Sequence, residues 1–341
     1  MEGFAGILGH ERAIGILRRS IVAGRLHHAT LIVGPVGVGK RRVADALSRA
    51  LNCVGESAAQ GAPCEACTHC LRIAEGIHPD VRVVVPDTSK ARPTIPIAVI
   101  RELLREVNYR PYEARCRVII VDEADALTEE AANALLKTLE EPTGETLFAL
   151  VTARPQRLLA TIRSRCQLVR LAPLPRALVQ RHLVEQAGVP LERAEVCAAF
   201  SEGSIGKALM LSQEGVLDAR REIIEAVAAL READALDVFA LASKQARVGN
   251  QELQANLESL KTFYRDVALA SAGANDDRAI NVDLRPLIAQ AASELTLEAA
   301  IRHIEQIDAV QSGLRAYVDA HLLLEDLFFS LASGRSPRST L

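Results

Sequence analysis

The chain contains no tryptophan, and its four tyrosines and seven phenylalanines make aromatic residues only 3% of the 341 residues. Core packing must therefore depend on leucine, isoleucine, valine and alanine. A chain of this length is too long for one ordinary core, so we expect two or three domains.

A large net charge is also missing, because 40 Lys and Arg stand against 43 Asp and Glu and give a formal charge of −3. This balance excludes a stand-alone nucleic-acid binder with a global basic field, so any contact with DNA must be local. The sequence also lacks an apolar run of transmembrane length and the charged and apolar regions of a signal peptide. We therefore expect a cytoplasmic protein without a membrane partner.

Seven cysteines in a cytosolic chain argue against a disulfide framework and for metal binding or buried thiols. Cys53, Cys64, Cys67 and Cys70 follow the spacing Cys-x10-Cys-x2-Cys-x2-Cys, and four thiolates at such spacings suit tetrahedral Zn²⁺. The intervening segment 55–61 is too polar to fold without a metal. The pattern favours a structural zinc site with no open catalytic position, with free thiols or redox chemistry as the alternative.

The remaining cysteines and one histidine are assigned no chemistry. His69 lies inside the four-cysteine segment, and we expect its side chain to face solvent. The three isolated cysteines are expected to be small buried residues: Cys116, Cys166 and Cys197.

Up to about residue 170 the sequence alternates between β-branched apolar runs and helical periods, which predicts a parallel sheet with helices on both faces. The predicted strands lie at 30–33, 81–85, 118–121 and 147–151, and a short strand-like run follows at 167–171. Beyond Pro173 and Pro175 the pattern is helical, with apolar stripes that indicate a domain core and leave an additional role as a subunit interface open. The last residues, 335–341, are predicted to be a frayed tail.

The most informative pattern is Gly34-Pro35-Val36-Gly37-Val38-Gly39-Lys40-Arg41, which follows an apolar strand and precedes a helical period. This is the context of a phosphate-binding P-loop, whose backbone N–H groups and helix N-terminus face a phosphate while Lys40 reaches the terminal phosphates. A working NTPase has Ser or Thr at the next position as a Mg²⁺ ligand, whereas this chain has Arg41. The pattern leaves nucleotide binding open and argues against Mg²⁺ coordination and efficient hydrolysis.

An apolar strand at 118–121 ends in Asp122 and Glu123, as in a Walker B element. Asp122 would hold Mg²⁺ and Glu123 would orient the attacking water. The alternative is an ordinary acidic turn at a strand end, and the P-loop about eighty residues upstream favours the functional interpretation.

Arg165 lies in Ser164-Arg165-Cys166, at an element boundary. From spacing alone it is a solvated surface arginine. If the segment were extended, Arg163 would share the face of Arg165.

At this point a family resemblance can be stated. The chain resembles the δ′ family of clamp-loader subunits of bacterial DNA polymerase III, within the AAA+ superfamily. The matching motifs are 26–29 (Leu-His-His-Ala), the four-cysteine module, His78-Pro79-Asp80, 122–125, 132–142 and 161–167. The resemblance is strong from about residue 4 to 172 and weaker beyond. It implies an AAA+ P-loop domain over 1–171 with a zinc module at 53–70, a helical lid domain over 172–213 and an all-α collar domain over 214–334.

Two departures separate this chain from the sibling γ/τ ATPase subunits, which share most of these motifs. Similarity to γ/τ requires Ser or Thr at position 41 and an arginine at position 206, and this chain has Arg41 and Gly206. The resemblance implies that the Ser-Arg-Cys motif survives and that Arg165 is donated in trans to a neighbouring subunit's ATP. Glu123 would then be a vestige of a catalytic site.

The resemblance implies a stator and arginine-finger donor that assembles with the γ/τ and δ subunits and acts with them on a sliding clamp and primed DNA. ATP or ADP, if bound, would contact Gly34, Pro35, Gly37, Val38, Gly39, Lys40, Arg41, Asp122 and Thr152. Two alternatives stay open: an active γ/τ-type ATPase, and a zinc-stapled scaffold that binds no nucleotide. Direct DNA contact is left undecided.

Overall fold

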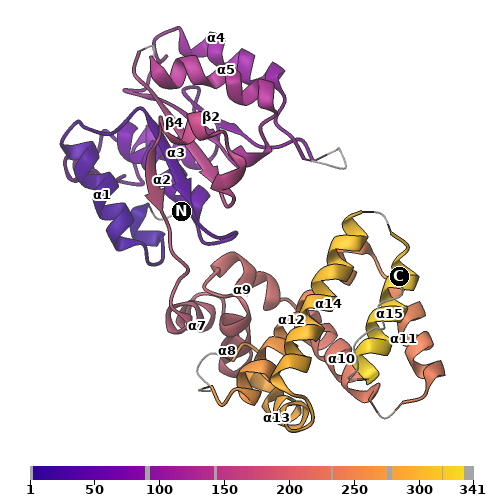
Figure 1. Ribbon diagram of the computed structural model, residues 1–341. Coiled ribbons are helices and arrows are strands. Elements are labelled where there is room, and N and C mark those ends of the chain that lie inside the picture. Colours follow the sequence, from indigo (N-terminus) through magenta and orange to yellow (C-terminus); the bar gives the residue numbers. More distant parts are fainter. Residues whose placement is uncertain are drawn as a thin grey trace. The chain divides into compact units, whose positions relative to one another are not determined.

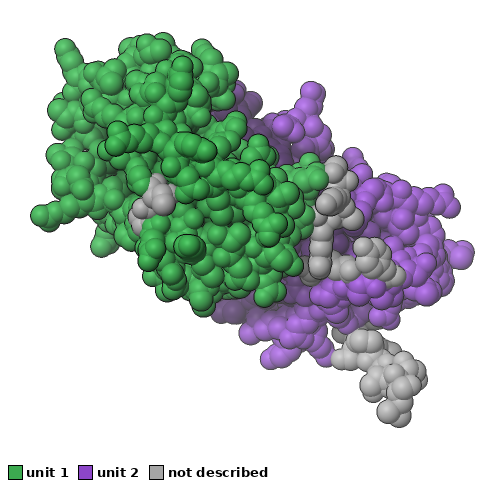
Figure 2. All heavy atoms as spheres, turned by 90° about the horizontal axis from the view of Figure 1, so that it is seen from above, with its two compact units in different colours: residues 1–179, 203–207 green, residues 180–202, 208–341 purple. Residues whose placement is uncertain are grey.

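The computed structural model describes residues 3–88, 93–141, 144–231, 233–274, 279–316 and 318–333. The predicted tail at 335–341 and Pro142 of the clamp-loader motif lie outside these ranges. The chain divides into two compact units, coloured separately in Figure 2. The first unit comprises Met1–Val179 and Gly203–Lys207, and the second comprises Gln180–Glu202 and Ala208–Leu341. The predicted lid at 172–213 is shared between them, so its separation as a third domain stays a prediction.

The first unit is built on a five-stranded parallel sheet with the order β2-β3-β4-β1-β5. Figure 1 labels β2 and β4 of this sheet. Its central strands are wholly buried, whereas the two edge strands expose part of their side chains. This is the burial expected of a parallel sheet covered on both faces, and it confirms the predicted strands to within about one residue. The strands are β1 Ala29–Val33, β2 Val81–Val84, β3 Arg117–Val121, β4 Thr146–Thr152 and β5 Gln167–Arg170.

Helices cover both faces of this sheet. On one face, alternate strand residues such as Leu31, Ile119 and Phe148 pack against α4 and α5, which lie together in Figure 1. On the other face α2 packs against β1, β3 and β4 and contacts α1 and α3. The helices of this unit are α1 Glu11–Val22, α2 Lys40–Asn52, α3 Thr68–Ala74, α4 Ile97–Val107, α5 Glu129–Glu140 and α6 Ala160–Arg163, with 3-10 turns η1 Phe4–Gly6, η2 Glu56–Gln60, η3 Ala124–Ala126 and η4 Pro155–Arg157.

The described part of the second unit is helical, as the apolar stripes predict. Its core gathers leucine, isoleucine and valine side chains around the long helix α12, which packs against α10, α13 and α14. A buried ion pair joins Arg220 to Asp283 at 2.8 Å. The helices that make up this part are α8 Leu191–Phe200, α10 Val216–Ala229, α11 Ala235–Ala246, α12 Asn250–Ser271, the 3-10 turn η6 Val282–Leu284, α13 Arg285–Glu294, α14 Leu297–Arg315 and α15 Ala320–Ser333.

Two further helices have residues in both units: α7 Arg176–Glu185 and α9 Ile205–Leu211. Across the described residues of either unit, every helix is too short or too polar to cross a bilayer.

Candidate functional site

The P-loop joins β1 to α2 at the carboxyl edge of the sheet, the edge where ligands bind in parallel α/β folds. Gly37 and Gly39 have φ angles of 73° and 104°, a region that disfavours residues with a side chain. A Cβ on Gly34 would lie 2.5 Å from the carbonyl oxygen of Leu171. The sequence therefore places glycine where the backbone turns and where it passes close to a neighbouring segment.

Lys40 and Arg41 begin α2 and make different contacts. The Lys40 Nζ donates to the carbonyl oxygen of Pro35 at 2.6 Å. Burial lowers the pKa of this lysine, and this effect is larger than that of the nearby carboxylates, which raise it. The Arg41 guanidinium donates to Asp45 at 3.0 Å through Nε and to Asp122 at 3.4 Å through Nη1. A fixed positive charge thus pairs with the carboxylate that holds Mg²⁺ in a Walker B element.

The acidic side of the site follows β3. Glu123 has a left-handed backbone (φ 47°) and its N–H donates to Asp122 Oδ1 at 3.0 Å. Asp125 accepts hydrogen bonds from the Thr152 hydroxyl at 2.5 Å and from Arg154 Nε at 2.7 Å. Since the Thr152 oxygen also accepts from the Arg154 N–H at 2.9 Å, its hydroxyl is already engaged on both sides.

A cavity of about 530 Å³ lies over these groups. The structure brings six of the nine predicted nucleotide contacts to its wall: Gly37, Gly39, Lys40, Arg41, Asp122 and Thr152. Glu123 and Arg154 line it as well. The other three predicted residues do not line the cavity: Gly34 is half-buried, Pro35 is exposed and Val38 is buried.

The first residues of the short helix α9 pack against the P-loop. The N–H of Gly206 donates to the carbonyl oxygen of Gly37 at 2.9 Å, and a Cβ on Gly206 would lie 3.0 Å from the Gly37 Cα. A Cβ on Gly37 would in turn lie 2.4 Å from the Ser204 hydroxyl. The close approach of the two backbones therefore favours glycine at position 206, because a side chain there would require the P-loop to shift by a few tenths of an ångström.

His10 is a contact that the sequence pattern did not reveal. It precedes α1 with a left-handed backbone (φ 64°), and its Nε2 donates to the carbonyl oxygen of Val38 at 3.1 Å. Arg42 donates to the Gly6 carbonyl at 2.9 Å. Both contacts fix the N-terminal segment to the P-loop, and their partners lie 28 and 36 residues apart, beyond the reach of local periodicity.

Arg165 lies just after α6. Its Nη2 forms an ion pair with Glu140 at the end of α5, and its Nη1 donates to the Thr161 carbonyl at 3.0 Å. About one third of the side chain is exposed. The segment before it is helical and not extended, so the condition under which Arg163 would share this face is not met; Arg163 ends α6 and is exposed.

The four cysteine thiols of the predicted zinc module converge, with their sulfur atoms all within 4.8 Å of one another. Cys53 follows the end of α2, where Asn52 exchanges two 2.9 Å hydrogen bonds with the backbone of Cys116 and so fixes that end of the helix to the sheet. The Cys64 N–H donates to the Cys53 sulfur at 3.3 Å, and the Cys67 N–H donates to the Cys64 sulfur at 3.2 Å. These four thiols fit a tetrahedral Zn²⁺ site closed to other ligands.

The electrostatics of the module differ between its cysteines, and they favour the thiolate at Cys64 only. The backbone N–H of Ala66 is the main cause that lowers the pKa of Cys64 to about 6, whereas burial raises the pKa of Cys70. A Cβ on Gly55 would lie 2.6 Å from the Cys64 sulfur, so only glycine allows the chain to pass there. Of the isolated cysteines, Cys197 is buried and the other two are half-buried.

The prediction that His69 faces solvent is wrong, because its Nδ1 lies 2.8 Å from Nε2 of the buried His78. The Asp80 N–H donates to His78 Nδ1 at 3.1 Å, so the proton of the neutral ring is on Nε2 and is donated to His69. Glu113 completes the group and is paired with Arg72 at 2.5 Å. A metal on His78 Nε2 would have to displace that proton, so the contacts favour a hydrogen-bonded network over a second metal site.

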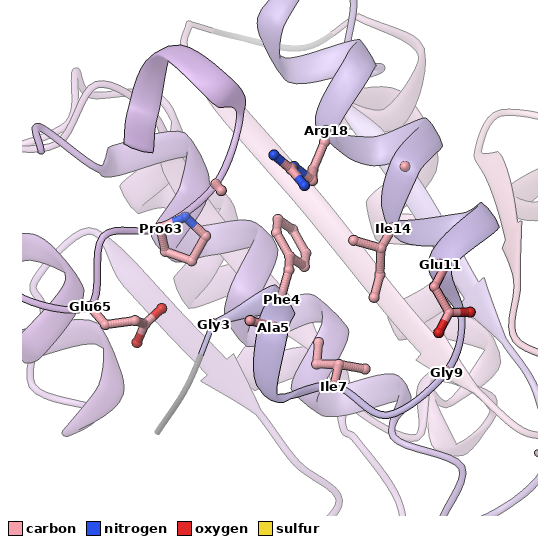
Figure 3. Close-up of a pocket in the computed structure, with 12 residues that line it drawn as sticks. Gly3, Phe4, Ala5, Ile7, Gly9, Glu11, Ile14, Arg18, Pro63 and Glu65 are labelled. Carbon is pink, nitrogen blue, oxygen red and sulfur yellow. The ribbon is translucent and has the colours of Figure 1, made fainter. Parts of the chain in front are cut away.

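A larger cavity, of about 810 Å³, lies elsewhere in the first unit, between the N-terminal segment, α1 and the zinc module (Figure 3). Phe4 and Ile14 point into it. Its carboxylate Glu65 is paired with the buried Arg49. None of the predicted nucleotide contacts lines this cavity, which separates it from the P-loop site.

Comparisons with known proteins agree with this geometry. A family model described as DNA polymerase III, delta subunit, matches residues 9–175, and the C-terminal model of the delta subunit matches residues 214–332. A DNA polymerase III subunit delta' from Bacillus subtilis (strain 168) is 32% identical over 326 residues, covering 95% of this chain and 96% of that protein. A DNA polymerase III subunit delta' from Escherichia coli (strain K12) is 33% identical over 325 residues, covering 93% and 92%. A DNA polymerase III subunit tau from the same strain is 31% identical over 313 residues, covering 84% of this chain and 47% of that protein.

Proposed function

The chain belongs to the family of DNA polymerase III delta' subunits, and on this premise we propose that it is a clamp-loader subunit that turns over little or no ATP itself. In this proposal it assembles with γ/τ and δ subunits as a stator. The assembled complex opens a sliding clamp and places it on primed DNA. The chain would contribute to that work by fixing geometry and by completing a neighbour's active site.

The observation that carries this proposal is the ion pair between Arg41 and Asp122, at 3.4 Å. A Walker B carboxylate binds Mg²⁺ by its negative charge, and the guanidinium neutralises that charge while repelling a divalent cation. Both side chains are about one third exposed or less, so solvent screens the pair only in part. To reach Asp122, Mg²⁺ would have to displace the guanidinium of Arg41, which Asp45, four residues later on α2, also holds by an ion pair.

Two further features support weak or absent turnover. The Thr152 hydroxyl donates to Asp125 and accepts from Arg154, so it cannot also bond a phosphate without losing a present partner. Gly206 offers only a backbone N–H, which is donated to Gly37. Three parts of one site therefore depart from the chemistry of hydrolysis in the same direction.

The role proposed for Arg165 is catalysis in trans. A guanidinium placed beside a neighbour's ATP stabilises the charge that develops on the transferred phosphoryl group, worth roughly 10³ to 10⁵ in rate. The Arg165 side chain is partly exposed on the surface of the first unit, and its partners are one surface carboxylate, the carbonyl of Thr161 and the hydroxyl of Ser164. These contacts are weak enough to be exchanged for a phosphate.

A second candidate, an active γ/τ-type ATPase, is favoured by one observation: the 530 Å³ cavity still gathers Lys40, Asp122 and Glu123 on its wall. ATP turnover by the pure chain separates the two proposals. We expect no turnover above a Lys40→Ala control, whereas steady turnover abolished by Lys40→Ala would establish the ATPase.

Clamp loading is tested by reconstitution. We expect that γ/τ and δ subunits load a sliding clamp onto primed DNA efficiently only when this chain is added. Equal loading with and without the chain, with assembly checked by size-exclusion chromatography, would contradict the proposed role.

A further inference from the structure

Two tyrosines on the loop between α4 and β3 are the starting point. Tyr109 is 74% exposed and Tyr112 is 85% exposed, whereas Tyr264 in the second unit is buried. In a chain whose residues are only 3% aromatic, two rings presented to solvent on one short loop are unusual. Exposed aromatic side chains that no protein group covers are surfaces for a partner.

The backbone of this loop is held firmly from beneath. The buried carboxylate of Asp80 accepts hydrogen bonds from the N–H groups of Tyr112, Glu113 and Ala114 at 2.7, 2.8 and 3.0 Å. The buried guanidinium of Arg117 donates to the carbonyl oxygens of Tyr109 and Arg110, at 2.9 and 3.1 Å. Asp80 and Arg117 also contact each other at 3.3 Å.

These contacts fix the backbone at both tyrosines, so little backbone entropy is lost if a ligand covers the rings. The His78-Pro79-Asp80 motif therefore acts on the shape of this loop.

The surroundings of the two rings are positively charged. Arg101 and Arg105 lie four residues apart on α4, and Arg110 and Arg115 lie on the loop itself; all four are exposed. Among the described residues, no ion pair or hydrogen bond is made by the guanidinium groups of these four arginines. Two of the nearby carboxylates are already neutralised: Glu106 by Arg82 at 2.9 Å, and Glu113 by Arg72 at 2.5 Å.

We propose that residues 101–115 bind single-stranded nucleic acid, with Tyr109 and Tyr112 stacking on bases and the arginines contacting phosphates. Exposed aromatic rings and arginine side chains are the two elements from which single-strand sites are built, and stacking requires no particular base. Tyrosine and arginine are also enriched at protein interfaces, so a protein partner is the competing occupant that the test must separate from a nucleic acid. The inference rests on the proposed function, since a clamp-loader subunit works beside the single-stranded template of primed DNA.

The test uses the full-length chain and a fluorescein-labelled oligothymidylate, with binding followed by anisotropy at low salt. Tyr109→Ala combined with Tyr112→Ala should weaken binding by about tenfold or more, since stacking contributes about five- to 150-fold per base. A variant with Tyr109→Phe and Tyr112→Phe should bind the oligonucleotide as the wild-type chain does, because both aromatic rings are kept. Leu236→Ala with Leu322→Ala, which removes two other exposed apolar side chains, should leave it unchanged.

Charge is tested separately. Arg105→Ala with Arg110→Ala should weaken binding and reduce its salt dependence, whereas Arg247→Ala with Arg265→Ala, an equal change of charge on exposed residues of the second unit, should not. Equal effects of the two arginine pairs would reduce the binding to non-specific charge and overturn the proposal.

Two other results would also overturn it: no binding of the oligonucleotide by the wild-type chain, or tyrosine variants that keep oligonucleotide binding while losing retention of the sliding clamp. The last result would make the loop a protein interface. Because the readout is direct binding, its failure leaves the ATPase and clamp-loading results unaffected and thus does not count against the proposed function.

Discussion

Arg165 can act in trans only if it can leave Glu140, and the structure allows the cost to be bounded. The Glu140 side chain is about half exposed and that of Arg165 about one third. Exposed ion pairs contribute about 0.2 to 1 kcal/mol, which corresponds at most to about fivefold in an equilibrium constant. A trans arginine is worth roughly 10³ to 10⁵ in rate, or about 4 to 7 kcal/mol. The ion pair is therefore too weak to hold Arg165 back.

The perturbation that tests this balance is Glu140→Gln, which keeps the shape of the side chain and removes its charge. In the reconstituted complex we expect the DNA- and clamp-stimulated ATPase to stay unchanged or to rise by at most about fivefold. The free energy of unfolding of the chain should fall by no more than about 1 kcal/mol. Glu141→Gln, at the next and also exposed position, is the matched control.

One result would refute this reasoning. If Glu140→Gln lowered the ATPase of the assembled complex by tenfold or more while Glu141→Gln did not, Glu140 would be needed to orient Arg165. The pair would then be part of the catalytic device, and a bound based on exposed ion pairs would not apply to it.

Two other predictions concern the zinc module and the second unit. Protein prepared without chelator should carry one equivalent of zinc, and this zinc should be lost in Cys67→Ser but kept in Cys116→Ser. Metal analysis near zero equivalents in the wild type would contradict this prediction. Chelation of the zinc should speed proteolysis within residues 53–70 only. Burial, reinforced by Arg231 and Arg302, lowers the pKa of His303 from 6.5 to about 4, so the folded state excludes a proton that the unfolded chain binds. The free energy of unfolding of the second unit should therefore fall by up to about 3 kcal/mol as the pH drops from 6.5 to 4. Hydrogen exchange in α12 and α14 measures this pH dependence, and His303→Gln should make it weaker over that pH range. The same pH dependence in His303→Gln and in the wild type would mean that other groups cause it.

The sequence predicted the parts of the first unit that depend on local pattern. The β-branched runs gave the five strands, and the cysteine spacing gave a cluster of four thiols that the structure brings within 4.8 Å. The alternation of strand and helix also gave the parallel sheet, because a chain of such units can cover both faces of a sheet only in this way. These features depend on residues close together in the chain.

What the sequence did not reveal depends on contacts between distant residues. Arg41 and Asp122 are 81 positions apart, and their ion pair follows from β1 and β3 ending at the same edge of the sheet. The close approach of Gly206 to Gly37 explains sterically why a glycine at position 206 is favoured, which a comparison of motifs cannot do. The contact of His69 is more local: the connection from α3 to β2 brings His78, nine residues later, to its side chain.

The measurement that tests the central claim most directly is the ATPase of the reconstituted complex with wild-type chain and with Arg165→Ala. If the chain works in trans, Arg165→Ala should assemble normally by size-exclusion chromatography and lower the stimulated turnover at that interface by roughly 10³-fold or more. Arg163→Ala, two residues earlier and exposed, should leave turnover unchanged. Equal ATPase for the wild type and Arg165→Ala, with assembly intact, would make Arg165 an ordinary surface arginine and contradict the account.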